Sequence, residues 1–170
     1  MTKKTKLKIV ALIPIFIFVT IIGLNGFLNW KSFSIFALSQ NSKFISNLLG
    51  SNEIPPITSK AAGMAEFTTM NSSISYNVII ESIHGVTSGH IHFGKPWENG
   101  KVVATLFNFN SPRNKVSEHG QINATGLSGP LKGRPISDLI SAIENGNAYV
   151  NIHTQKNVNG EIRGQIIPLK

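Results

Sequence analysis

Alternation of apolar and polar residues is clearest in Ser73-Ile74-Ser75-Tyr76-Asn77-Val78-Ile79-Ile80-Glu81-Ser82. Successive side chains of an extended chain point to opposite faces. One face of this stretch therefore carries four large, mainly apolar side chains, those of Ile74, Tyr76, Val78 and Ile80. The pattern predicts a β-strand with one buried face and one face towards solvent.

Shorter segments of similar character lie on both sides of this strand. We expect further strands over residues 43–51, 65–69, 90–93, 101–109, 121–124, 148–153 and 161–167. One helix interrupts them, opening at Pro135-Ile136-Ser137-Asp138 with Ser137 or a neighbour as the cap, and ending at Gly146. The expected fold is an all-β antiparallel sandwich or Greek-key barrel of about seven or eight strands with one short helix.

Charge and cysteine content restrict the classes of function. The chain has 170 residues, a formal net charge of +8 and no cysteine. From Gln40 onward the chain contains 11 lysines and arginines and 8 aspartates and glutamates. Most of the excess positive charge therefore lies before this point. A nucleic-acid binder keeps its basic patch in the folded part, so we expect no nucleic-acid partner. Without a thiolate, any metal site must use histidines and carboxylates.

The first forty residues indicate a membrane segment. Four lysines precede residues 9–28, which carry no charge and are long enough to span a bilayer as a helix. We expect residues 1–30 to be a signal-anchor or signal peptide, 31–42 a linker and 43–170 the β domain. An uncleaved segment leaves the domain membrane-anchored outside the cytoplasm. Cleavage near Ser39 instead gives a secreted protein.

Histidines supply the candidate metal ligands. In a strand, His90 and His92 of the Gly89–Gly94 segment point to one face, with α-carbons about 6.5–7 Å apart. His153 ends another predicted strand, so three imidazoles can meet on one copper or zinc ion. His119 is a further candidate for a fourth ligand. The alternative is structural, with these histidines hydrogen-bonded inside the sandwich.

Arg163 has two interpretations. It can pair with Glu161 or hold a loop carbonyl, or it can guide a small anion towards a nearby metal. Asn71-Ser72-Ser73 and Asn123-Ala124-Thr125 have the form of glycosylation acceptors. The chain shows no nucleophile–base pair, carboxylate pair or phosphate loop, so we do not expect an enzyme.

Several segments together resemble the CHRD domain, the module named after chordin. They are Leu48–Pro56, Ala62–Phe67, Ile83–Gly94, Gly146–Thr154 and Gly160–Ile166. The resemblance covers residues 43–167 and implies an all-β extracellular module. In chordin the module belongs to a protein that sequesters growth factors. We therefore expect a non-enzymatic binding or structural role at the cell surface, with a protein or surface polymer as partner.

A second, weaker resemblance is to copper/zinc superoxide dismutases. Residues 83–94 are similar to their copper-binding strand, and residues 150–153 to a later ligand strand. The sandwich is therefore expected to be superoxide dismutase-like or immunoglobulin-like, and this resemblance implies His90, His92 and His153 as copper ligands and Arg163 as the anion guide. The loop with the bridging histidine and zinc ligands is missing, as is the cysteine pair, so dismutase activity is not expected.

Overall fold

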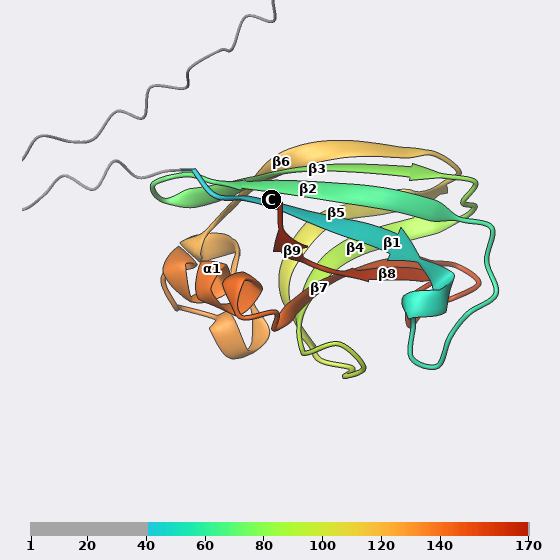
Figure 1. Cartoon of the computed structure of the whole chain (residues 1–170). Helices are drawn as coiled ribbons and strands as arrows, with labels where there is room; N and C mark the ends of the chain where they lie inside the picture. Colours follow the sequence, from blue (N-terminus) through green and yellow to red (C-terminus); the bar gives the residue numbers. More distant parts are fainter. Residues whose placement is uncertain (1–40, 170) are drawn as a thin grey trace, which may run out of the picture. The chain divides into compact units, whose positions relative to one another are not determined.

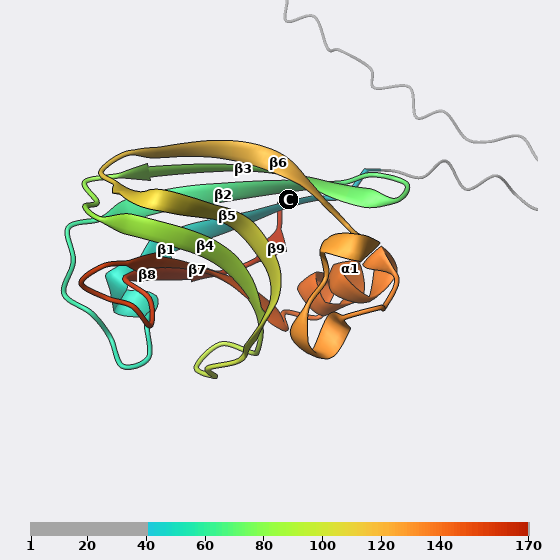
Figure 2. The ribbon, with the colours of Figure 1, turned by 180° about the vertical axis from the view of Figure 1, so that it is seen from behind.

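A computed structural model of the chain describes residues 41–169. Within this range there are nine β-strands and one α-helix (Figures 1 and 2). The strands are β1 Lys43–Leu49, β2 Ala62–Thr69, β3 Ser73–Glu81, β4 Val86–Phe93, β5 Lys101–Arg113, β6 Val116–Asn123, β7 Ala148–Thr154, β8 Ile162–Gln165 and β9 Ile167–Pro168. The helix is α1, Ile136–Glu144, and single 3₁₀ turns cover Gly50–Asn52, Ala124–Gly126 and Gly129–Leu131.

All strand pairs are antiparallel, and their order is β5-β4-β7-β8-β1-β2-β3-β6, with β9 added to β1. β4 follows β3 in the chain, yet β3 pairs with β6 while β4 pairs with β5 and β7. This crossing connection is the Greek-key arrangement. The predicted all-β antiparallel fold with one short helix is confirmed.

The barrel is nearly closed, because the strands at the two ends of this order are linked. β5 and β6 are joined by the short turn at residues 114–115. Across the seam between them, the Tyr76 hydroxyl on β3 donates a hydrogen bond to the Leu106 carbonyl on β5. Gly120 lies opposite Tyr76 in the β3–β6 register. A β-carbon on Gly120 would lie 2.5 Å from the Tyr76 oxygen, so only glycine leaves room for that ring.

The apolar core fills the interior of the barrel, and α1 covers one end of the barrel beside β7 (Figure 1). Ile74, Val78 and Ile80 of β3 are buried as the alternation predicts, while Tyr76 is half-buried at the seam. The helix buries Ile136, Leu139 and Ile143 against the same core. Burying each such side chain contributes about 1.5–3 kcal/mol of hydrophobic free energy.

Two local expectations differ from the structure. The helix is capped by Pro135 with no side-chain hydrogen bond, because Ser137 already lies inside its first turn. Residues 161–167 were expected as one strand but form β8 and β9. At the break between them, the backbone amide of the buried Ile166 donates a hydrogen bond to the Ala148 carbonyl. β9 then pairs with β1.

The predicted membrane segment, residues 9–28, lies outside the described residues. Among residues 41–169, no helix is long and apolar enough to cross a membrane.

Candidate metal centre

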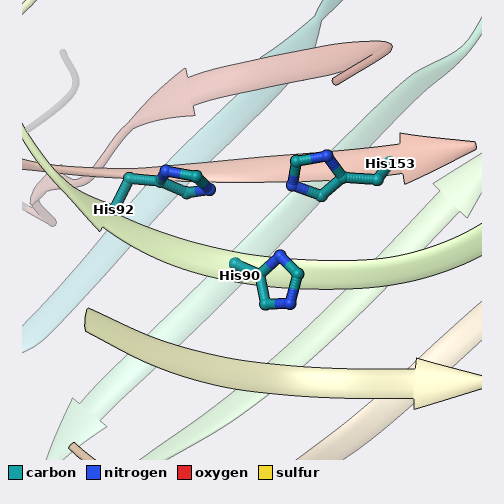
Figure 3. Close-up of side chains that lie close together, drawn as sticks. All are labelled: His90, His92 and His153. Carbon is teal, nitrogen blue, oxygen red and sulfur yellow. The ribbon is translucent and has the colours of Figure 1, made fainter. Parts of the chain in front are cut away.

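Strands β4 and β7 bring three histidines together on the outer face of the barrel. His90 and His92 lie on β4 and His153 lies on the neighbouring β7, opposite Ser88. Their neighbours in the chain, Ile91 and Ile152, are buried in the core, so the histidines face away from it. One ring nitrogen from each histidine lies within 4.8 Å of those of the other two, and the rings surround a common space (Figure 3).

Hydrogen bonds to two turns orient two of the rings. His92 Nδ1 lies 2.9 Å from the Gly100 carbonyl, and His153 Nδ1 lies 3.0 Å from the Val158 carbonyl. A carbonyl only accepts, so each Nδ1 carries the proton and donates it. The opposite nitrogens, His92 Nε2 and His153 Nε2, are then unprotonated. They are buried and have no hydrogen-bond partner, and the same is true of His90 Nδ1.

Burial keeps the three rings uncharged. Desolvation, with smaller effects from His153 and His92, lowers the pKa of His90 from 6.5 to about 4. Desolvation also lowers the pKa of His92 and of His153, although the Gly100 and Val158 carbonyls partly oppose it. At neutral pH the lone pairs of these imidazoles are therefore free, which is the state that binds a metal ion.

His119 does not join the three histidines. It lies on β6, opposite Asn77, and is exposed. Within residues 41–169, the one group of three or more histidine, aspartate or glutamate side chains close enough to share an ion consists of His90, His92 and His153.

Arg163 is buried and holds the turn between β4 and β5. Its guanidinium donates to the Asn99 side-chain oxygen at 3.1 Å and to the Glu98 carbonyl at 2.8 Å. Glu161 does not pair with it and instead accepts hydrogen bonds from three other side chains, those of Ser59, Thr154 and Asn157. Of the two interpretations from sequence, these contacts favour the loop anchor, and anion guidance stays a prediction.

Tyr149 was not singled out from the sequence, yet it connects Arg163 to the histidines. Its ring stacks on His92 with centroids 5.0 Å apart, and the Arg163 guanidinium carbon lies 3.4 Å from its centroid. Its hydroxyl accepts a hydrogen bond from the Gly100 amide at 3.0 Å. The spacing Tyr149-x-Asn151-x-His153 already places these three side chains on one face of a strand, so this signal was available.

A cavity of about 570 Å³ borders His92 on the same side of the sheet. Its wall includes Glu53 and Asn151, both buried, with the Asn151 amide 3.4 Å from a Glu53 oxygen. Desolvation raises the pKa of Glu53 from 4.5 to about 7, although the Arg163 charge and the Asn151 hydrogen bond lower it. No sequence pattern predicts this environment of Glu53, because burial of a single glutamate leaves no periodic signal.

Comparison with known families agrees with this architecture. The family model described as the CHRD domain matches residues 44–166, from the second residue of β1 to the residue after β8, and the match includes all three histidines. The chain belongs to the CHRD domain family. Comparison with curated proteins found no match. Membership in the CHRD family supports the general prediction of a module with a non-enzymatic role, and it leaves the ligand of the histidines open.

Proposed function

We propose that this CHRD domain binds one transition-metal ion, copper or zinc, through His90, His92 and His153. The observation that carries the proposal is the close grouping of the three histidines, because one ring nitrogen of each lies within 4.8 Å of those of the other two. Each ring also has one buried nitrogen without a hydrogen-bond partner, and the carbonyl bonds leave those of His92 and His153 unprotonated. Neutral imidazole is a preferred ligand of both ions.

A purely structural role explains less of the geometry. The bonds from His92 and His153 to carbonyls do tie two turns to the sheet. They leave the opposite nitrogens without partners, however, and each unsatisfied buried acceptor costs about 1–3 kcal/mol. A shared metal ion satisfies all three nitrogens at once. The carbonyl bonds then have the usual role of fixing the tautomer and orientation of metal ligands.

Binding requires a small inward movement of the rings. Three nitrogens spaced evenly around one ion at about 2.0–2.1 Å lie about 3.3–3.6 Å apart. The observed limit of 4.8 Å is wider, so the rings must turn towards the ion. We expect rotation about the side-chain bonds to supply this movement.

Titration of the full chain with Cu(II) and Zn(II), followed by calorimetry, tests the proposal. We expect one equivalent to bind, and the double variant His90→Ala/His153→Ala to bind at least tenfold more weakly. The matched control is His84→Ala/His119→Ala, which also removes two imidazoles but leaves the three-histidine group intact. Equal affinity of the two double variants would refute the site.

We also propose that the domain lies outside the cytoplasm, anchored through residues 9–28 or secreted after cleavage near Ser39. The lysines before the apolar segment support this orientation. Because the chain has no cysteine, single cysteines can report it. Ser117→Cys, at an exposed position on β6, should react with a membrane-impermeant maleimide in intact cells, whereas Thr2→Cys should react only after lysis. The opposite labelling pattern contradicts the proposed location.

A further inference from the structure

We infer that the three-histidine site selects Cu(I) over Zn(II) and Cu(II). The inference rests on the proposed metal site and adds the identity and charge of its ion. Three properties of the site support it: the number of ligands, the seclusion of the ligand atoms and the charge of the surroundings.

The number of strong protein ligands is three. Every histidine, aspartate and glutamate of the chain falls within residues 41–169, and the chain has no cysteine. Within that range, the group close enough to share an ion contains only His90, His92 and His153. Zinc sites are almost always four-coordinate, and Cu(II) prefers four or more ligands in a tetragonal arrangement. Cu(I) accepts three nitrogens without a fourth ligand, whereas Zn(II), which also has a filled d shell, keeps four ligands.

Water is a poor candidate for the fourth ligand here. The three nitrogens that would hold the ion are buried, although other parts of the His90 and His153 rings reach solvent. His92 is only 8% exposed and is covered by Tyr149 and the Gly100 turn. An ion centred between these nitrogens therefore has buried ligand atoms around it, while solvent reaches the outer parts of the His90 and His153 rings and the cavity beside His92.

The surroundings favour a single positive charge. All three ligands are neutral, so the ion keeps its full charge after binding. Arg163 places a further positive charge near the site. Its guanidinium stacks on the Tyr149 ring, and that ring in turn stacks on His92. The free energy of moving an ion out of water increases with the square of its charge, so a divalent ion suffers about four times the penalty of Cu(I).

Two competition experiments on the full chain test the inference. Cu(I), kept reduced by ascorbate without oxygen, is competed against bicinchoninate, and Zn(II) is competed against a chromophoric zinc chelator. We expect at least tenfold tighter binding of Cu(I), and an X-ray absorption edge typical of three-coordinate Cu(I). Equal or tighter binding of Zn(II), or a four-coordinate copper spectrum, overturns the inference but leaves the metal site standing. Failure of every ion to bind refutes the site itself.

A designed fourth ligand gives an independent test. Thr105 on β5 is exposed and lies directly opposite His90, so a carboxylate there can reach the same ion. Thr105→Glu should raise the affinity for Zn(II) relative to Cu(I) by tenfold or more. Ser117→Glu, at an exposed position on β6, adds the same charge to another strand and should leave the ratio unchanged. An unchanged ratio in Thr105→Glu contradicts the inference, provided that the variant still binds Cu(I).

Discussion

The ring of Tyr149 lies almost parallel to that of His92, with an interplanar angle of 17° and centroids 5.0 Å apart. The same tyrosine accepts a hydrogen bond from the Gly100 amide, and the Gly100 carbonyl accepts one from His92. Tyr149 therefore positions His92 twice, once by stacking and once through Gly100. This relationship makes it a positioning residue for the candidate metal centre.

Removing the Tyr149 hydroxyl should weaken metal binding more than it weakens the fold. In Tyr149→Phe the stacking stays, but the Gly100 amide loses its acceptor, and we expect about 1 kcal/mol lower stability. Metal affinity should fall about tenfold, as is usual when support behind a ligand is lost. Tyr76→Phe is the matched control, because it also loses a hydroxyl bond but lies at the seam. Its metal affinity, measured by the same competition assay, should equal that of the wild type.

The Arg163 contacts predict that lysine cannot replace it. Lysine offers one ammonium group, which cannot reach Asn99 and Glu98 together while also stacking on Tyr149. We expect Arg163→Lys to lose about 1–3 kcal/mol of unfolding free energy in urea. Arg134→Lys is the control, because Arg134 forms an exposed pair with Asp138 and should change stability by less than about 0.5 kcal/mol. Similar losses in both variants would contradict the anchoring role of Arg163.

Much of the barrel could be predicted from the sequence because strand periodicity is a local property. The alternation around Tyr76 and the His-x-His spacing both fix which face a side chain occupies. The pairing of β4 with β7 is not local, so the sequence could suggest but not establish that His153 lies beside His90 and His92. The carbonyls of Gly100 and Val158 could not be predicted at all, since any residue type supplies a carbonyl.

The seam between β5 and β6 predicts a specific coupling between two residues. Gly120→Ala places a methyl group against the Tyr76 ring, and overpacking of this kind typically costs 1–3 kcal/mol. In the Tyr76→Ala background the space is free, so the same substitution should cost less than about 0.5 kcal/mol. A double-mutant cycle by urea unfolding measures the difference. Additive effects of the two substitutions would show that Gly120 is not required by Tyr76.

Glu53 predicts an inverse dependence of stability on pH. Burial raises the pKa of Glu53 from 4.5 to about 7, so between these values the folded protein binds a proton that the unfolded chain has lost. The unfolding free energy should therefore fall as pH rises through this window, by about 3 kcal/mol in total. Glu53→Gln has no carboxyl to ionise, so its stability relative to the wild type should increase from pH 4.5 to 7 and then level off.

The quantity to compare is the difference in unfolding free energy between Glu53→Gln and the wild type, because the titrations that both proteins share cancel in this difference. His90, His92 and His153 have lowered pKa values, so they act in the opposite direction and lower stability as pH falls below their unfolded value. Both proteins contain these histidines, so that contribution cancels in urea unfolding with metal removed. Glu66→Gln, at an exposed position on β2, shows what the same change does on the surface. A difference in unfolding free energy that stays constant across this pH range would contradict the raised pKa. It would mean that the Glu53 carboxyl of the wild type is already ionised in the folded protein, with the Arg163 charge compensating for its burial.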